Sequence, residues 1–251
     1  MPLILRAATR LSTARERMVY NWSKFTQPCL LCDLPADTAH ALCAACQEEL
    51  PWLGAHCTVC ALPLPAAGLV CAQCLRRAPS FARVEAPWRY AFPLDALITR
   101  FKHQRAWPYG RLLGGLLAEH LRHAWLEGLP RPELLLPVPL GRARLRERGF
   151  NQAALLSGWL ARTLGLAARE DLLRRNLDTV AQQGLDAAAR RRNLRGAFAV
   201  VAPQAVAGRH VALVDDVLTT GATAETLARL LRQAGAQRVD VYCLARTPAP
   251  G

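Results

Sequence analysis

The chain has 251 residues, enough for one α/β domain and a small accessory module. Its hydrophobic content of 52% excludes a disordered protein, and it has no apolar run of about 18 residues that could span a membrane. The net charge is +13, and all but two of the 32 basic residues are arginines, the lysines being Lys24 and Lys102. This charge favours polyanionic partners such as nucleic acid, although codon bias explains the excess of arginine over lysine equally well.

Residues 1–28 are expected to form an N-terminal extension. The first 25 residues are basic and poor in acids, and they lack the apolar core of a secretory signal. A short surface helix or frayed extension fits them better than an organelle presequence, which is the alternative.

Residues 29–76 are expected to form a zinc module. Eight of the nine cysteines lie there in two groups of spacing C-x2-C-x10-C-x2-C, with an offset of 28 residues: Cys29, Cys32, Cys43, Cys46 and Cys57, Cys60, Cys71, Cys74. Paired knuckles can point four thiolates at one ion, and metal binding supplies folding energy to a short segment. We expect two structural Zn²⁺ ions.

Other arrangements of these cysteines stay open. The absence of a secretory signal disfavours disulfides, and an iron–sulfur cluster is a further alternative. The repeat suggests that neighbouring knuckles pair, yet the first and third knuckles could also pair. The ninth cysteine, Cys243, is expected to be a buried core thiol.

Residues 77–251 are expected to form an α/β domain. Its elements, in chain order, are a linker within 75–95 ending in a strand at 88–92, helix over 94–127, a strand at 134–138, a basic loop at 139–150, a helix at 151–166 ending near Gly165, a mobile loop at 176–186, a basic helix to Arg195, strands at 197–202, 210–214 and 239–244, and a helix at 222–234 stopped by Gly235. This alternation predicts a parallel sheet with crossover helices.

The strongest local signal runs from His210 to Thr223. A strand ending at Val214 is followed by Asp215 and Asp216, and a small polar loop then opens a helix. The N–H groups at the start of a helix suit a phosphate, whereas carboxylates repel phosphate and suit sugar hydroxyls. A ribose 5-phosphate offers both groups. The alternative is a plain strand–turn–helix connection with Asp and Thr as caps.

This segment resembles the PRPP (phosphoribosyl pyrophosphate) motif of type I phosphoribosyltransferases. The resemblance implies a parallel sheet with flanking helices. It also implies that Asp215 and Asp216 hold the ribose hydroxyls and steady an oxocarbenium-like transition state, and that Mg²⁺ accompanies the pyrophosphate. The 5-phosphate would be held by the following loop: Thr219, Thr220, Gly221, Ala222 and Thr223.

Three further segments, with the cysteines, resemble the competence protein ComF family, including its ComFC/GntX-like members with a double zinc ribbon. They are Ile98 to Lys102, Val138 to Leu140 with Arg148-Gly-Phe-Asn-Gln152, and Gln182 to Phe198. The resemblance covers residues 29–247. It implies a cytoplasmic protein of natural DNA uptake, with other uptake proteins as partners and a phosphoribosyltransferase-like domain of unsettled substrate.

The resemblance also assigns basic residues to the ligand. Arg148 would face the pyrophosphate, with charge added by Arg142, Arg144 and Arg146, and Lys102 would reach a phosphate. A solvated charged face and an exposed helix lysine are the alternatives. Residues 179–183 resemble a mobile lid. The six histidines show no grouping that indicates catalysis.

Two functions remain in competition. One is a ComF-like protein that binds PRPP and single-stranded DNA, the DNA along the arginine clusters at 142–148 and 190–195. The other is a phosphoribosyltransferase acting on a nucleobase or other small acceptor. Whether transfer is catalysed at all stays open. The intact acidic and Thr-Gly elements disfavour a third possibility, a purely structural zinc adaptor.

Overall fold

The computed structural model describes residues 27–103, 106–176 and 196–249, and it divides into two compact units, Met1–Glu49 and Leu50–Gly251. The expected zinc module, 29–76, therefore spans the boundary between the units. The expectations for residues 1–26, for the lid at 179–183 and for the arginines at 190–195 lie outside the described residues. The first unit contains one four-cysteine group and the short helix α2 (Ala44–Glu48).

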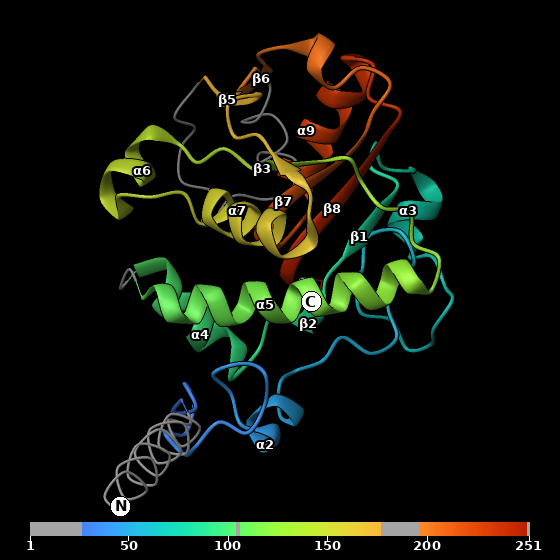
Figure 1. Ribbon diagram of the computed structural model, residues 1–251. Helices are drawn as coiled ribbons and strands as arrows, with labels where there is room; N and C mark the ends of the chain where they lie inside the picture. The colour runs from blue at the N-terminus through green and yellow to red at the C-terminus, as the bar shows by residue number, and fades with distance from the viewer. Residues whose placement is uncertain (1–26, 104–105, 177–195, 250–251) are drawn as a thin grey trace, which may run out of the picture. The chain divides into compact units, whose positions relative to one another are not determined.

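A parallel sheet organises the larger unit, as the sequence predicts (Figure 1). Its strand order is β1-β8-β7-β3-β4, with β2 also paired to β8, and every pairing in it is parallel. The strands are β1 (Arg83–Glu85), β2 (Trp88–Arg89), β3 (Leu134–Pro137), β4 (Ala167–Ala168), β7 (His210–Leu218) and β8 (Arg238–Arg246). The central strands β3, β7 and β8 are almost continuously buried, as strands covered on both faces must be.

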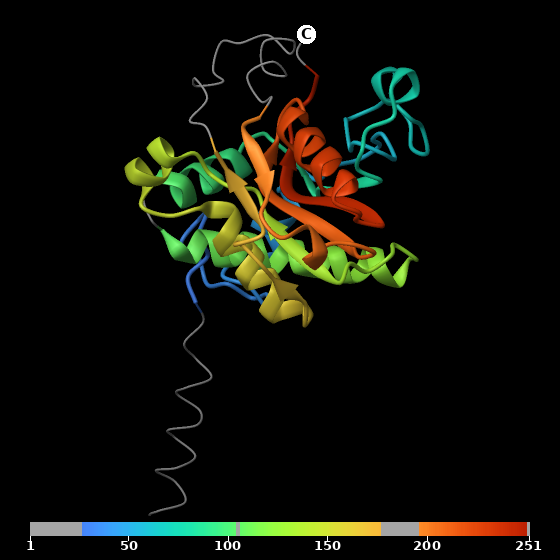
Figure 2. The same cartoon turned by 90° about the horizontal axis from the view of Figure 1, so that it is seen from above.

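Helices cover both faces of this sheet (Figures 1 and 2). The helices of the larger unit are α3 (Ala72–Arg76), α4 (Leu94–His103), α5 (Trp107–Leu126), α6 (Arg142–Arg148), α7 (Gln152–Leu164), α9 (Ala222–Gln233) and a 3-10 turn at Pro203–Ala205. The pair α5 and α7 packs on one face and α9 on the other. The helix expected at 151–166 is confirmed, and it ends at Gly165 in the left-handed conformation.

One expectation near the helices needs correction. The basic loop expected at 139–150 is wrong, because residues 142–148 form helix α6. Gly141 precedes this helix in an extended conformation, and Gly149, at φ 78°, ends it. Arginine, alanine and leucine are good helix formers between such ends. The helical pattern expected over 94–127 is confirmed as two helices, α4 and α5, and Pro108 lies in the first turn of the second one.

The short strands differ from the expectation in their bounds and in their pairing. The expected linker contains β1, and the expected strand at 88–92 is only Trp88–Arg89. The strand expected at 197–202 is β6 (Phe198–Val200), but it pairs antiparallel with β5 (Leu173–Arg175) in a separate two-stranded sheet. Strands of two or three residues exist only because a partner is present, so local composition does not reveal them.

The strand that carries the acidic pair is longer than expected. It was predicted to end at Val214, but β7 continues to Leu218, with Asp215 opposite Cys243 and Leu218 opposite Arg246 in β8. The two carboxylates therefore lie within a paired strand instead of in a free loop. This rigid placement defines the geometry of the site.

Candidate functional site

The two four-cysteine groups have the same backbone structure, each within its own unit. Asp33 and Ala61 occupy equivalent places in the 28-residue repeat, and both are left-handed, at φ 61° and φ 56°. Each donates its N–H to the carbonyl of the first cysteine of its group, Cys29 or Cys57, at 2.9 Å. A short helix, α2 or α3, follows the third cysteine in each group. The sequence repeat is thus a repeat of structure.

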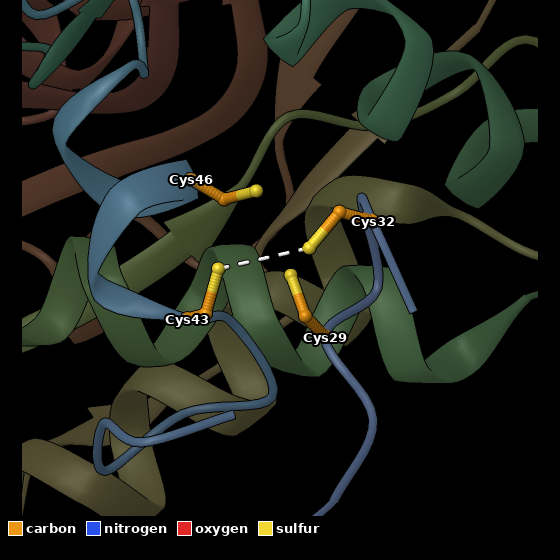
Figure 3. Close-up of side chains that lie close together, drawn as sticks. All are labelled: Cys29, Cys32, Cys43 and Cys46. Carbon is orange, nitrogen blue, oxygen red and sulfur yellow. Dashed lines mark hydrogen bonds between the residues drawn. The ribbon is translucent and has the colours of Figure 1, made fainter. Parts of the chain in front are cut away.

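In each group the four sulfurs converge on one point, as Figure 3 shows for the first. Within a group, the ligand atoms all lie within 4.8 Å of one another. The Sγ–Sγ distance is 3.7 Å between Cys32 and Cys43 and 3.6 Å between Cys60 and Cys71. Four sulfurs placed 2.3 Å from a central ion are about 3.8 Å apart, so the geometry fits Zn²⁺. Neighbouring knuckles pair, which resolves the interleaved alternative.

Backbone hydrogen bonds favour a thiolate at the first cysteine of each group. Burial raises the pKa of Cys29, but N–H donors, foremost that of Cys43, outweigh it and lower the pKa to about 6. Burial likewise raises the pKa of Cys57, and the N–H groups of Cys60 and Cys71 lower it to about 7. Thiolates are the form that binds a metal. All eight cysteines are free thiols, and the disulfide alternative is not supported.

The second ribbon is built into the larger unit. Ala61 is fully buried in the main hydrophobic core, and the N–H of Val84 in β1 donates to the carbonyl of Val59 at 2.9 Å. Arg246, which is 6% exposed, donates from Nε to the carbonyl of Cys60 at 3.0 Å. The folding of this ribbon is therefore coupled to the sheet.

Arg246 also holds the loop that follows β7. Its Nη1 donates to the carbonyls of Leu218 at 3.1 Å, of Thr219 and of Thr247 at 2.8 Å. These hydrogen bonds fix the position of the loop relative to the end of β8. The role of Arg246 cannot be predicted from the sequence, because nothing in it distinguishes a buried arginine from the many exposed ones.

The acidic pair occupies the carboxyl end of β7 with Lys102 beside it. Nζ of Lys102, from the last turn of α4, lies 2.9 Å from Oδ2 of Asp216. Oδ1 of Asp215 accepts the N–H of Asp216 at 2.9 Å, and Oδ1 of Asp216 accepts that of Val217 at 2.7 Å. One oxygen of each carboxylate thus bonds the backbone. The structure brings together three of the residues named from the sequence.

The loop after the acidic pair has the form of a phosphate cradle. Gly221 precedes α9 at φ 74°, a conformation that favours glycine. Helix α9 begins at Ala222, and the N–H groups of a helix's first turn have no intrahelical acceptor and carry partial positive charge. Thr219, Thr220 and Thr223 lie next to this helix start in the sequence, and the hydroxyl of Thr220 accepts the N–H of Ala222 at 3.4 Å. The arrangement can bind an anion at the loop and hydroxyl donors at the carboxylates.

Arg148 ends α6 beyond the carboxyl end of β3, the strand next to β7. It is partly buried, and its Nε has no hydrogen-bond partner within the described part of the chain. Arg142, Arg144 and Arg146 are exposed on the same short helix. A buried donor without a partner is costly, so Arg148 is suited to an anion that the polypeptide does not supply.

Burial raises the pKa of Asp215 to about 7, and the charge of Asp216 adds to this effect while Lys102 opposes it. An ordinary aspartate has a pKa of about 3.9. The folded protein therefore binds more protons than the unfolded chain between these values. The protonated carboxyl contributes stability that is complete below about pH 4 and is lost as the pH rises through about 7.

We expect Asp215→Asn, which removes this titration, to become more stable relative to wild type as the pH rises from about 5 to about 8. Urea unfolding at several pH values measures this. Asp171→Asn is the control, because Arg169 holds the pKa of exposed Asp171 at about 2, so no change is expected over the same range. A flat difference for Asp215→Asn would show that the carboxyl is ionised throughout.

Comparisons with known proteins agree with this division into ribbon and α/β parts. Residues 24–75 match the double zinc ribbon domain family, and residues 169–251 match the phosphoribosyl transferase domain family. The chain is 38% identical over 212 residues to competence protein F of Haemophilus influenzae, covering 82% of this chain and 91% of that protein. It is 38% identical over 220 residues to DNA utilization protein YhgH of Escherichia coli, covering 87% and 90%.

Among solved structures, the chain resembles glutamine PRPP amidotransferase from B. subtilis in complex with ADP and GMP. The two are 23% identical, the match covers 53% of this chain and 25% of that one, and the TM-score is 0.36.

Proposed function

This chain belongs to the competence protein F family, and we propose that it serves in DNA uptake, binding PRPP at its phosphoribosyltransferase domain and single-stranded DNA on its basic surface. The main support for the proposal is that two carboxylates, Asp215 and Asp216, lie at the end of a strand, directly before a loop and helix start at Thr219–Thr223. We call this loop and helix start the phosphate cradle, because its N–H groups can bind a phosphate. A ribose 5-phosphate group has hydroxyl donors and an anion at the two ends of one sugar, which matches this pair of subsites.

Each named residue has a role in this proposal. Asp215 and Asp216 accept hydrogen bonds from the ribose 2- and 3-hydroxyls, and in a transfer reaction they would steady positive charge on the sugar. The N–H groups and hydroxyls at 219–223 bind the 5-phosphate. Arg148 and Lys102 neutralise the pyrophosphate, which Mg²⁺ would accompany.

The DNA part of the proposal is supported by charge. The net charge is +13, and α6 presents three exposed arginines close to Arg148. The relatives carry the names competence protein and DNA utilization protein.

No helix in the described ranges is long and apolar enough to cross a membrane. A cytoplasmic location and partners among other uptake proteins remain predictions.

We expect single-stranded DNA to bind with strong salt dependence. Each phosphate contact contributes about −0.7 to the slope of log affinity against log salt, so Arg142→Gln with Arg146→Gln should reduce the slope by about 1.4. Fluorescence anisotropy of a labelled oligothymidylate measures this. Arg174→Gln with Arg209→Gln removes the same charge from exposed residues outside α6 and serves as the control. Equal slopes in both variants would mean that the arginines of α6 face solvent and do not contact DNA.

The second candidate is a phosphoribosyltransferase that acts on a nucleobase or other small acceptor. The family match over 169–251 favours it. Release of pyrophosphate from Mg²⁺-PRPP in the presence of a panel of bases would identify the enzyme. Binding of PRPP without release would favour the accessory protein.

A further inference from the structure

A cavity lies beside the loop that follows β7. It has a volume of about 550 Å³ and is enclosed by the second ribbon, the first two turns of α9 and the segment after β8. Thr219, Thr220, Gly221 and Ala222 contribute one wall. Asp215, Asp216, Lys102 and Arg148 do not line it, so the cavity is separate from the acidic pair although it shares the loop.

Besides the buried Arg246, three exposed cationic side chains line this cavity. They are Arg76, Arg77 and Arg229, and all three are exposed. Within the described ranges, Arg77 and Arg229 form no ion pair. A cavity with free arginines at its edge is suited to an anion.

The acid in this lining does not neutralise the arginines. Glu225 is the acidic residue among the lining side chains, and both of its oxygens already bind Ser80. Oε2 accepts the N–H of Ser80 at 2.7 Å, and Oε1 accepts its hydroxyl at 2.9 Å. Because the lining has four arginines and one glutamate, the cavity keeps a net positive charge.

The remaining walls are apolar and rigid. Leu62, Phe81, Leu218 and Pro248 supply apolar surface. Arg246 forms part of the lining as well, and its bonds to four carbonyls fix the ribbon, the loop and the segment after β8 to one another. The cavity is thus preformed, and its volume lies within the roughly 300–1,000 Å³ of small-molecule sites.

We infer that this cavity is a second ligand site that binds a nucleoside phosphate. The apolar walls would take the flat base, and Arg77 and Arg229 would bind the phosphate through paired N–H donors. A free mononucleotide and the terminal nucleotide of a single strand share this chemistry. Neither carboxylate lines the cavity, so it differs from the PRPP site in its charged groups, but the two sites share the loop residues Thr219 to Ala222.

The test is calorimetric titration of the zinc-loaded chain with deoxyadenosine monophosphate, with a short oligothymidylate and with Mg²⁺-PRPP. Arg77→Gln with Arg229→Gln should weaken nucleotide binding by about a hundredfold, since each charge-assisted contact accounts for roughly tenfold or more. It should leave PRPP binding unchanged. Arg174→Gln with Arg209→Gln, the charge-matched control, should change neither. Thermal melting confirms that the variants fold.

The outcomes separate the alternatives. Loss of mononucleotide binding in the cavity variant alone supports the inference with a free nucleotide as ligand. Loss of oligonucleotide binding alone, with no mononucleotide binding to wild type, supports it with a strand end as ligand. Equal nucleotide binding in both variants overturns it, as does loss of that binding in Asp215→Asn with Asp216→Asn. Binding of PRPP and of the oligothymidylate that is unchanged in the cavity variant, with no mononucleotide binding, overturns the inference and leaves the proposed function intact.

Discussion

Replacing Asp215 and Asp216 together by asparagine should weaken the binding of Mg²⁺-PRPP by about a hundredfold or more. Hydrogen bonds to charged groups contribute roughly 1.5–3 kcal/mol each, and the variant loses two such acceptors. The phosphate cradle is unchanged, so a weak residual affinity for phosphate should persist. Calorimetric titration of both proteins with Mg²⁺-PRPP measures the effect.

The fold should survive this double substitution. Oδ1 of each aspartate accepts a neighbouring backbone N–H, and Oδ1 of asparagine can do the same. Lys102 loses its carboxylate partner, but its side chain is 19% exposed and can bind water. Glu170→Gln with Asp171→Asn removes the same charge from exposed residues and is the matched control. Equal affinity in the double variant and wild type would mean that the carboxylates are only turn residues.

The second large effect concerns the two ribbons, which should respond differently to loss of one ligand. Cys57→Ser should lower the melting temperature of the larger unit by about 10 °C or more, because metal binding is folding energy and a loss of several kcal/mol shifts a unit of this size by that amount. This ribbon shares Ala61 with the main core and the Cys60 carbonyl with Arg246. Its loss should therefore also weaken PRPP binding.

Cys29→Ser is the matched comparison, because it changes the equivalent ligand of the first ribbon. We expect it to lose one zinc ion, to unfold the segment around α2 and to leave PRPP affinity unchanged. The reason is that the first group belongs to the smaller compact unit. Metal analysis and thermal melting measure both variants. The same melting temperature in both would contradict the integration of the second ribbon with the sheet.

The features that the sequence predicted well are those that local chemistry determines. Cysteine spacing decides which sulfurs can share an ion, and the 28-residue repeat indicated the pairing that the structure has. The helix ending at Gly165 follows from one residue's conformational freedom. The start of α9 at Ala222 follows from a glycine, Gly221, directly before the helix.

The features that were missed depend on contacts between distant residues. The strand β7 extends past Val214 because β8 pairs with it, and this pairing partly buries Asp215. Arg246 contacts a carbonyl 186 positions away, a relation that no local pattern contains. The charge of residues 142–148 favours an exposed loop, whereas the glycines on either side, Gly141 and Gly149, are the boundaries of a helix.

The central claim is that a ribose 5-phosphate compound binds at the loop with its hydroxyls on the two carboxylates. Native mass spectrometry of the zinc-loaded chain, with Mg²⁺ and PRPP added, tests it most directly. We expect a complex of one chain, two zinc ions and one PRPP, present in wild type and in the Glu170→Gln with Asp171→Asn control and lost in Asp215→Asn with Asp216→Asn. A wild-type spectrum without any PRPP complex, or a complex that survives the loss of both carboxylates, would contradict the claim.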